Sequence, residues 1–242
     1  MHQMTTDSVP TLRMAWQDFK RLRPLKPRTT DDYDKRLRQV DDWLDLPINQ
    51  ITRSMVVERF DEIKQRSESH ANLIMKVLSS VLSYASARYE YADGQPMLAA
   101  NPVKVLKGLR LWNRVSRRQT IINTCDLAKW WQAVQSLDKQ GHSLGRDVLV
   151  VLLLTGMRKA EAARLRWGDI DFSNDSILIR DTKNGTDHQI PMGKYLRDFL
   201  WNRRLAQRHN NAACEYVFPG KDLTGHVKSI ENAIERVTAQ SG

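Results

Sequence analysis

The stretch of sequence that decides the fold reads Leu154-Thr155-Gly156-Met157-Arg158-Lys159-Ala160-Glu161-Ala162-Ala163-Arg164-Leu165-Arg166-Trp167. The run immediately before it, 148–153, is apolar on every side, which predicts a buried helix rather than an amphipathic surface helix. Gly156 is expected to end this helix, because glycine readily adopts the left-handed conformation that is common at helix C-termini. A second helix, rich in alanine and arginine, is predicted to follow the turn.

Arg158 is expected to leave the rigid turn between these two helices, with Glu161 three residues further along the same helix face. A guanidinium fixed at such a place can bind a phosphate or a carboxylate through two parallel hydrogen bonds. The alternative interpretation is a surface Arg–Glu pair on an ordinary helical hairpin, which an isolated Arg-x-x-Glu pattern would favour.

The pattern in this chain is longer than that pair. The run Thr-Gly-x-Arg-x-x-Glu-x-x-x-Leu-x-Trp, at residues 155–167, resembles the first catalytic box of the tyrosine recombinase (phage-type integrase) family at every position. The resemblance implies a fold that is mainly α with a small β-hairpin or sheet (α+β). It also implies a helical core-binding domain and a catalytic domain that act on double-stranded DNA, in a bacterial or phage-encoded protein associated with the nucleoid.

Charge and composition limit the other possibilities. The chain has 38 Lys+Arg and 28 Asp+Glu, a net charge of +10, which favours a polyanionic partner, most commonly nucleic acid, with an acidic membrane as the alternative. No segment is long and apolar enough to cross a bilayer, and the N-terminus lacks a signal-peptide core. Cys125 and Cys214 are too few for a disulfide scaffold, and the six histidines lack metal-ligand spacing. We therefore expect a cytoplasmic protein with reduced thiols, no metal, no cofactor and no membrane partner.

Residues 8–107 are predicted to form a domain of helices only. Thr29 or Thr30 is expected to cap the second helix, Thr52 or Ser54 the third, and Ser69 to start the fourth. The order of features resembles the core-binding domain of the family, which holds one face of the duplex. The resemblance makes five basic residues candidates for phosphate contacts: Lys26, Arg28, Lys35, Arg36 and Lys76. For each of them a solvated surface charge is the alternative.

Residues 108–121 are predicted to be a basic linker, because no acidic residue occurs between Asp93 and Asp126. Unopposed positive charge in a connecting segment suits contact with a phosphate backbone. The candidates for that contact are Arg110, Arg114, Arg117 and Arg118. A merely flexible linker is the alternative, but it would be expected to contain acids and would leave Leu109, Leu111 and Trp112 unexplained.

Residues 122–242 are predicted to form the second domain. A helix is expected over 126–137, whose two tryptophans favour core packing over base stacking, and Gly141 and Gly145 are expected to mark the loop after it. Branched residues at 176–182 and the return run 188–192 predict two strands joined at Asn184-Gly185, with Pro191 marking an edge strand.

Lys183 lies at the predicted tip of this hairpin. A lysine at a hairpin tip is by itself more often a solvated charge, whereas the resemblance makes it the hairpin lysine that reaches the scissile phosphodiester. Two further helices are predicted after the hairpin. The first is expected to be basic on its outer side through Arg197, Arg203, Arg204 and Arg208, and the second to bury Val227, Ile230, Ile234 and Val237.

Covalent cleavage of DNA needs a nucleophile, stabilisation of the charge on the transition state, and a proton for the leaving oxygen. The resemblance implies that Arg158 binds the non-bridging oxygens, that Glu161 braces Arg158, and that Lys183 is the general acid. The nucleophile in this family is a tyrosine that forms a 3′-phosphotyrosine bond.

The next family motif, His-x-x-Arg, has no match, because Ser229 follows His226 and Ala212 follows His209 at the arginine position. No C-terminal tyrosine follows either. We therefore expect a catalytic domain that is C-terminally incomplete and cannot complete strand cleavage. The sequence leaves open a fragment of an active integrase or a non-catalytic DNA-binding accessory or regulatory protein. Members of the family work as tetramers, whereas for this chain a monomer on DNA is expected.

Overall fold

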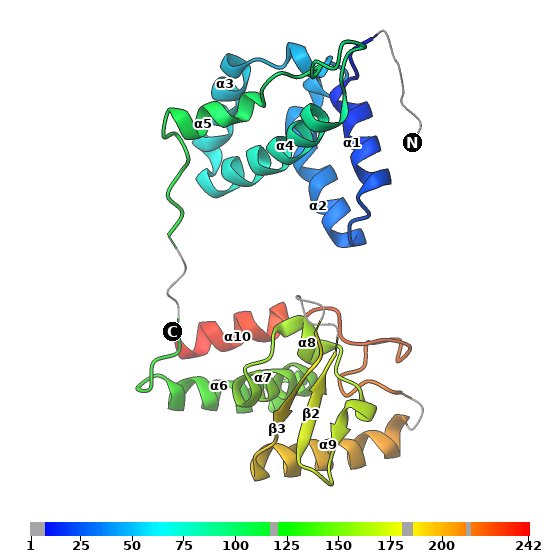
Figure 1. Ribbon diagram of the computed structural model, residues 1–242. Coiled ribbons are helices and arrows are strands. Elements are labelled where there is room, and N and C mark those ends of the chain that lie inside the picture. The colour runs from blue at the N-terminus through cyan, green and yellow to red at the C-terminus, as the bar shows by residue number, and fades with distance from the viewer. Residues whose placement is uncertain (1–7, 117–120, 181–185, 212–213) are drawn as a thin grey trace. The chain divides into compact units, whose positions relative to one another are not determined.

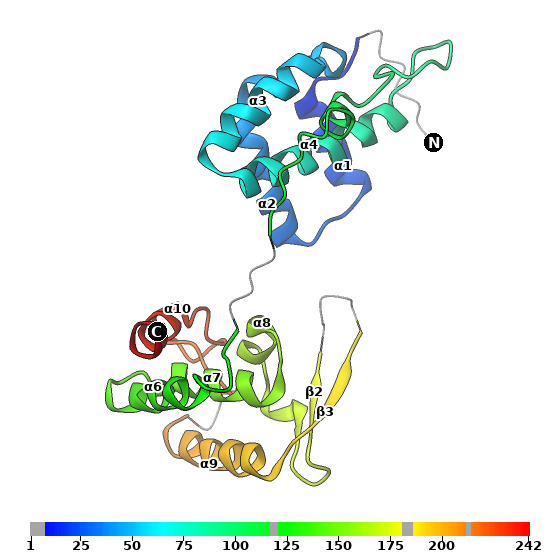
Figure 2. The same ribbon diagram turned by 90° about the vertical axis from the view of Figure 1, so that its left-hand side faces the viewer.

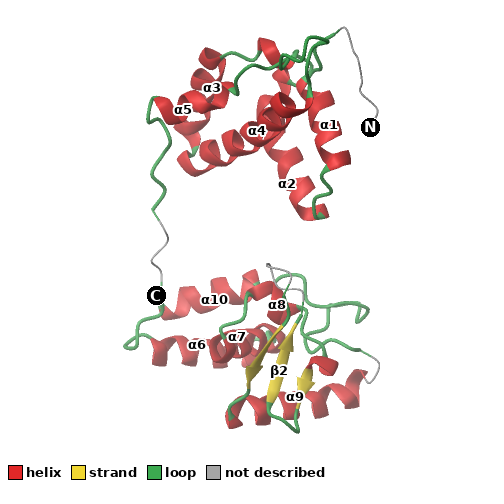
Figure 3. Ribbon diagram, in the orientation of Figure 1, coloured by secondary structure: helices red, strands yellow, loops and turns green. Residues whose placement is uncertain are grey.

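The computed structural model describes residues 8–116, 121–180, 186–211 and 214–242 (Figure 1). It divides the chain into two compact units, Met1–Arg118 and Gln119–Gly242. The predicted fold class, mainly α with a small β-sheet, is confirmed (Figure 3).

The first unit consists of helices. Its elements are α1 (Leu12–Leu22), α2 (Pro27–Leu37), η1 (Arg38–Trp43), η2 (Ile48–Gln50), α3 (Arg53–Arg66), α4 (Glu68–Arg88), η3 (Pro102–Lys104) and α5 (Val105–Gly108). The long helix α4 packs against α1, α2 and α3. Phe19 from α1, Phe60 from α3 and Leu78 from α4 are among its largest fully buried side chains, so the unit has a hydrophobic core of its own.

Two of the helix starts predicted for this unit are wrong. The helix α2 begins at Pro27, where the missing N–H of proline costs no hydrogen bond, so Thr29 and Thr30 lie inside the helix. The helix α4 begins at Glu68, and its cap is Ser67, whose hydroxyl accepts a hydrogen bond from the backbone N–H of His70 at 3.3 Å.

The first residues of the predicted linker pack onto the first unit. Leu111 and Trp112 lie against its core. The side chain of Asn72 donates to the carbonyl of Asn113 at 2.9 Å and accepts from its backbone N–H at 3.2 Å. These contacts explain Leu111 and Trp112, whereas Leu109 is exposed.

The second unit combines helices with a three-stranded sheet. Its elements are α6 (Leu127–Lys139), α7 (Ser143–Thr155), α8 (Lys159–Ala163), η4 (Trp167–Asp169), β1 (Ile170–Asp171), β2 (Ser176–Ile179), β3 (His188–Pro191), α9 (Lys194–Asn211) and α10 (Glu231–Ser241). The strands run antiparallel in the order β1-β2-β3, with Ile177 opposite both Ile170 and Ile190. Pro191 therefore lies on an edge strand, as predicted. Figure 2 shows β2 and β3 side by side, with α9 and α8 at opposite ends of the unit.

Helix α6 packs against α7 and α10. Gly145 lies inside α7 rather than in the predicted loop, and a Cβ atom at this position would lie only 2.5 Å from the Cβ of Ala233 in α10. The glycine therefore allows the two helices to approach closely. On α10 the buried residues are Ala233 and Val237, whereas Ile234, predicted to be buried, is exposed.

The helix α7 is less buried than its apolar sequence predicts. Residues Val148 to Val151 are buried, but Leu153 and Leu154 are exposed. Across the described ranges, no helix combines the length and the apolar character that crossing a membrane would need. The same ranges contain no group of three or more histidine, cysteine, aspartate or glutamate side chains placed to hold a metal ion.

Candidate functional site

The turn before Arg158 is held by local contacts that the sequence predicts. Gly156 ends α7 in the left-handed conformation, with a φ of 66°. The Thr155 hydroxyl donates to the carbonyl of Val151 at 2.6 Å and accepts from the backbone N–H of Met157 at 3.2 Å. Because Met157 is buried, the chain has little freedom where it enters α8.

Arg158 and Glu161 form a hydrogen-bonded pair at the start of α8. The Glu161 carboxylate accepts the backbone N–H of Arg158 at 2.9 Å and Nη1 of its guanidinium at 2.7 Å. The Glu161 side chain is 7% exposed and that of Arg158 is 58% exposed. Within the described residues, Nε and Nη2 of Arg158 donate no hydrogen bond, so they are available to a ligand.

The charge state of Glu161 follows from two opposing effects. Burial raises the pKa of Glu161, but the hydrogen bonds and the positive charge of Arg158 outweigh this and leave the pKa below its ordinary value. Glu161 is therefore ionised at neutral pH and holds the guanidinium in one orientation.

Replacing Glu161 by glutamine is expected to lower the free energy of unfolding at pH 7 by about 1–2 kcal/mol, because a charge-assisted hydrogen bond is lost. The folded-state pKa is lowered, so this contribution is complete above the unfolded pKa of about 4.3 and disappears as the pH falls through the lower folded-state value. Urea unfolding of the wild type and of Glu161→Gln from pH 7 to pH 3 checks this. The control is Glu235→Gln on the exposed side of α10. A difference between wild type and Glu161→Gln that stays constant with pH would contradict the prediction.

Several predicted site residues lie outside the described residues, namely Lys183, Arg117 and Arg118. The predicted convergence of Arg158 and Lys183 stays a prediction. The other predicted DNA contacts that are exposed are Lys26, Arg28, Lys35, Lys76, Arg110 and Arg114. Arg36 differs from these, because it forms two hydrogen bonds with Asp32 at 2.8 and 2.9 Å and its side chain is 19% exposed.

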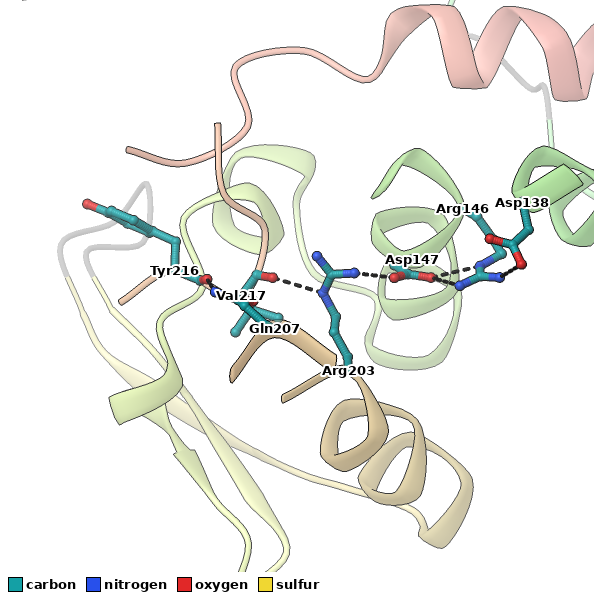
Figure 4. Close-up of polar contacts among 7 residues, drawn as sticks. All are labelled: Asp138, Arg146, Asp147, Arg203, Gln207, Tyr216 and Val217. Carbon is teal, nitrogen blue, oxygen red and sulfur yellow. Dashed lines mark hydrogen bonds and ion pairs between the residues drawn. The ribbon is translucent and has the colours of Figure 1, made fainter. Parts of the chain in front are cut away.

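The prediction that Arg203 lies on the outer side of α9 is wrong. Arg203 points into the unit, pairs with Asp147 of α7, and donates from Nε to the carbonyl of Val217 at 2.8 Å (Figure 4). Burial lowers the pKa of Arg203, and the negative charge of Asp147 partly offsets this. Asp147 also binds Arg146, which reaches Asp138 of α6 at 2.8 Å. This network ties α6, α7 and α9 to residue 217. The sequence signal for this network was Asp147, an acidic residue directly before the apolar run 148–153.

Helix α9 and the strand-like residues 165–167 hold the segment around Tyr216 from both sides. Gln207 of α9 donates to the carbonyl of Tyr216 at 3.0 Å (Figure 4). The backbone N–H of Val217 donates to the carbonyl of Leu165 at 2.9 Å. Sequence reasoning missed this arrangement, which places the Tyr216 ring 5.5 Å from that of His226 and its hydroxyl 3.3 Å from Nη2 of Arg166.

Comparisons with known proteins show what this chain is similar to. The model of the phage integrase family matches residues 119–242. Prophage integrase IntF of Escherichia coli (strain K12) is 26% identical over 195 residues, which are 80% of this chain and 40% of the relative. Tyrosine recombinase XerC of Pediococcus pentosaceus is 25% identical over 175 residues, which are 72% of this chain and 54% of the relative. The chain thus spans about half the length of these curated relatives.

Solved structures share the fold. A lambda integrase dimer bound to a COC′ core site aligns with a TM-score of 0.69 and 18% identity, over 96% of this chain and 81% of that one. The integrase of transposon Tn1549 in complex with transposon right end DNA aligns with a TM-score of 0.73 and 16% identity, over 95% of this chain and 78% of that one.

Proposed function

The chain belongs to the phage integrase family, and from this premise we propose that it binds duplex DNA for strand exchange of the tyrosine recombinase type. The observation that supports this most is the half-exposed guanidinium of Arg158, which the buried Glu161 carboxylate holds at a rigid turn. A guanidinium fixed in this way, with free N–H groups, suits the oxygens of a phosphodiester.

In the mechanism that we propose for strand cleavage, whose attacking nucleophile would have to come from outside these 242 residues, Arg158 binds the non-bridging oxygens of one phosphate and stabilises the charge that develops there. Glu161 is a positioning residue, because it touches Arg158 and not the phosphate. Lys183, outside the described residues, is proposed as the general acid that protonates the leaving oxygen. The proposed mechanism needs no metal or cofactor, since proton transfer and charge stabilisation both come from side chains.

The exposed basic residues of the first unit and of residues 108–121 are proposed to bind other phosphates of the same duplex. Such contacts are independent of sequence and set the affinity rather than the choice of site. A second arginine and a nucleophilic tyrosine, which strand cleavage would need, have no counterpart that we can assign in this sequence. We therefore propose that these 242 residues hold DNA as a monomer without breaking a strand by themselves.

Replacing Arg158 by alanine is expected to weaken binding to a duplex of random sequence by about tenfold, because one charge-assisted contact to a phosphate is lost. The affinity of Arg158→Lys should lie between those of the wild type and of Arg158→Ala, since lysine keeps the charge but loses the bidentate geometry. Fluorescence anisotropy at low salt measures the affinities. Denaturing gels of the same mixtures should show no covalent protein–DNA product.

The matched control is Arg208→Ala, which removes an equal charge from an exposed position of α9. Equal losses of affinity for Arg158→Ala and Arg208→Ala would show that net charge alone matters and would contradict the role of Arg158. A covalent product would contradict the proposal that no strand is broken.

A further inference from the structure

A pocket of about 370 Å³ lies next to the Arg158–Glu161 pair, because Glu161 forms part of its wall. Three segments far apart in the sequence line it: the end of α8 with the turn after it, the end of β2, and residues from the 216–226 stretch. All of them belong to the second unit.

Three arginines line this pocket, and two of them are neutralised. Arg180 forms an ion pair with Asp169, and Arg166 forms one with Glu215 at 3.1 Å. Arg164 donates from Nε to the carbonyl of Ala160 at 3.1 Å, but it has no carboxylate partner within the described residues. Arg164 is therefore the pocket arginine whose charge is not compensated.

The uncharged polar groups of the pocket are hydrogen-bond donors. The Tyr216 hydroxyl accepts a hydrogen bond from Arg166 and donates none within the described residues, so its own proton can be donated to a ligand. Burial and the nearby charges of Arg164 and Lys228 lower the pKa of His226, so its imidazole is neutral near pH 7 and carries one N–H. A guanidinium, a phenol and an imidazole around one cavity suit a ligand with several anionic oxygens, as a phosphate has.

The position of Arg164 relative to Arg158 suits a second phosphate of the same strand. Arg158 precedes α8 and Arg164 follows it. Glu161 binds Arg158 and also lines the pocket together with Arg164, so the pocket adjoins the place where Arg158 would hold its phosphate.

On the basis of the DNA binding proposed above, we infer that this pocket is a second phosphate subsite, in which Arg164 binds a backbone phosphate of the DNA other than the one that Arg158 contacts. Tyr216 and His226 orient that phosphate through neutral hydrogen bonds. The subsite would fix the register of the strand as it passes Arg158.

The test compares the salt dependence of duplex binding, since each phosphate contact contributes about 0.9 to the slope of log affinity against log salt. Arg164→Ala should make the slope shallower by about 0.9, the contribution of one phosphate contact, whereas Arg164→Lys should leave the slope unchanged. The double variant Arg158→Ala/Arg164→Ala should lose about two contacts. Arg208→Ala is the control, and Arg164→Gln, which keeps the side-chain stem, guards against a folding defect.

The outcomes separate the subsite from DNA binding as such. An unchanged slope for Arg164→Ala beside a steep wild-type slope would overturn the subsite and leave the proposed function standing. A double variant that loses only one contact would place both arginines on the same phosphate and would also overturn it. A wild-type affinity for the duplex that does not change with salt would contradict the proposed function itself.

A final arm distinguishes the source of the phosphate. Inorganic phosphate is added to the wild type and to Arg164→Ala in thermal melts without DNA. A rise in Tm that needs Arg164, together with an unchanged duplex slope, would assign the pocket to free phosphate and contradict a DNA subsite.

Discussion

Replacing Asp147 by alanine is expected to lower the free energy of unfolding of the second unit by about 3–5 kcal/mol. The Asp147 side chain is 6% exposed and that of its partner Arg203 is 15% exposed, so the variant leaves a buried guanidinium without its counter-charge. A loss of this size is a large part of the 5–15 kcal/mol that usually stabilises a domain. Hydrogen exchange can locate the effect, because protection should fall in α6, α7 and α9 and persist in α1 to α4.

Two further variants show whether the effect comes from the buried pair. Asp138→Ala removes the outer carboxylate of the same network, which is 52% exposed, and should cost less than about 1 kcal/mol. The double variant Asp147→Leu/Arg203→Met should recover most of the stability, since apolar groups can replace a buried pair. Equal losses for Asp138→Ala and Asp147→Ala would contradict the account.

The turn at 155–158 could be predicted from the sequence because its causes are local. Gly156 has the left-handed conformation and Glu161 lies one helical turn after Arg158, so residues within a few positions of one another determine the geometry. The pairing of β2 with β3 is similar, since the branched residues of β2 and the proline in β3 are properties of short segments.

Arg203 could not be placed in the same way. Its charge predicts the outer side of α9, although it follows the buried Leu196 and Leu200 at helical spacing and lies on their face. Charged residues usually lie on the surface, but Arg203 is buried because it pairs with Asp147, which is 56 residues away in the sequence. Partners at such separation are fixed by packing, which one sequence without structure does not reveal.

Affinity for duplex DNA is expected to fall by about 10³ or more between 50 and 200 mM salt, if six or more phosphates are bound. Six of the basic residues predicted to contact DNA are exposed in the described parts of the chain, and Arg158 and Arg164 add two more candidates. Each contact releases counterions from the duplex, so the affinity must depend steeply on salt whatever the DNA sequence.

The most direct test of the account is therefore a titration of a fluorescent duplex with the wild-type chain over a salt series. We predict a linear plot of log affinity against log salt with a slope of about −5 or steeper. A plot that is flat, or an absence of binding at the lowest salt, would contradict the claim that this chain holds DNA by its phosphates.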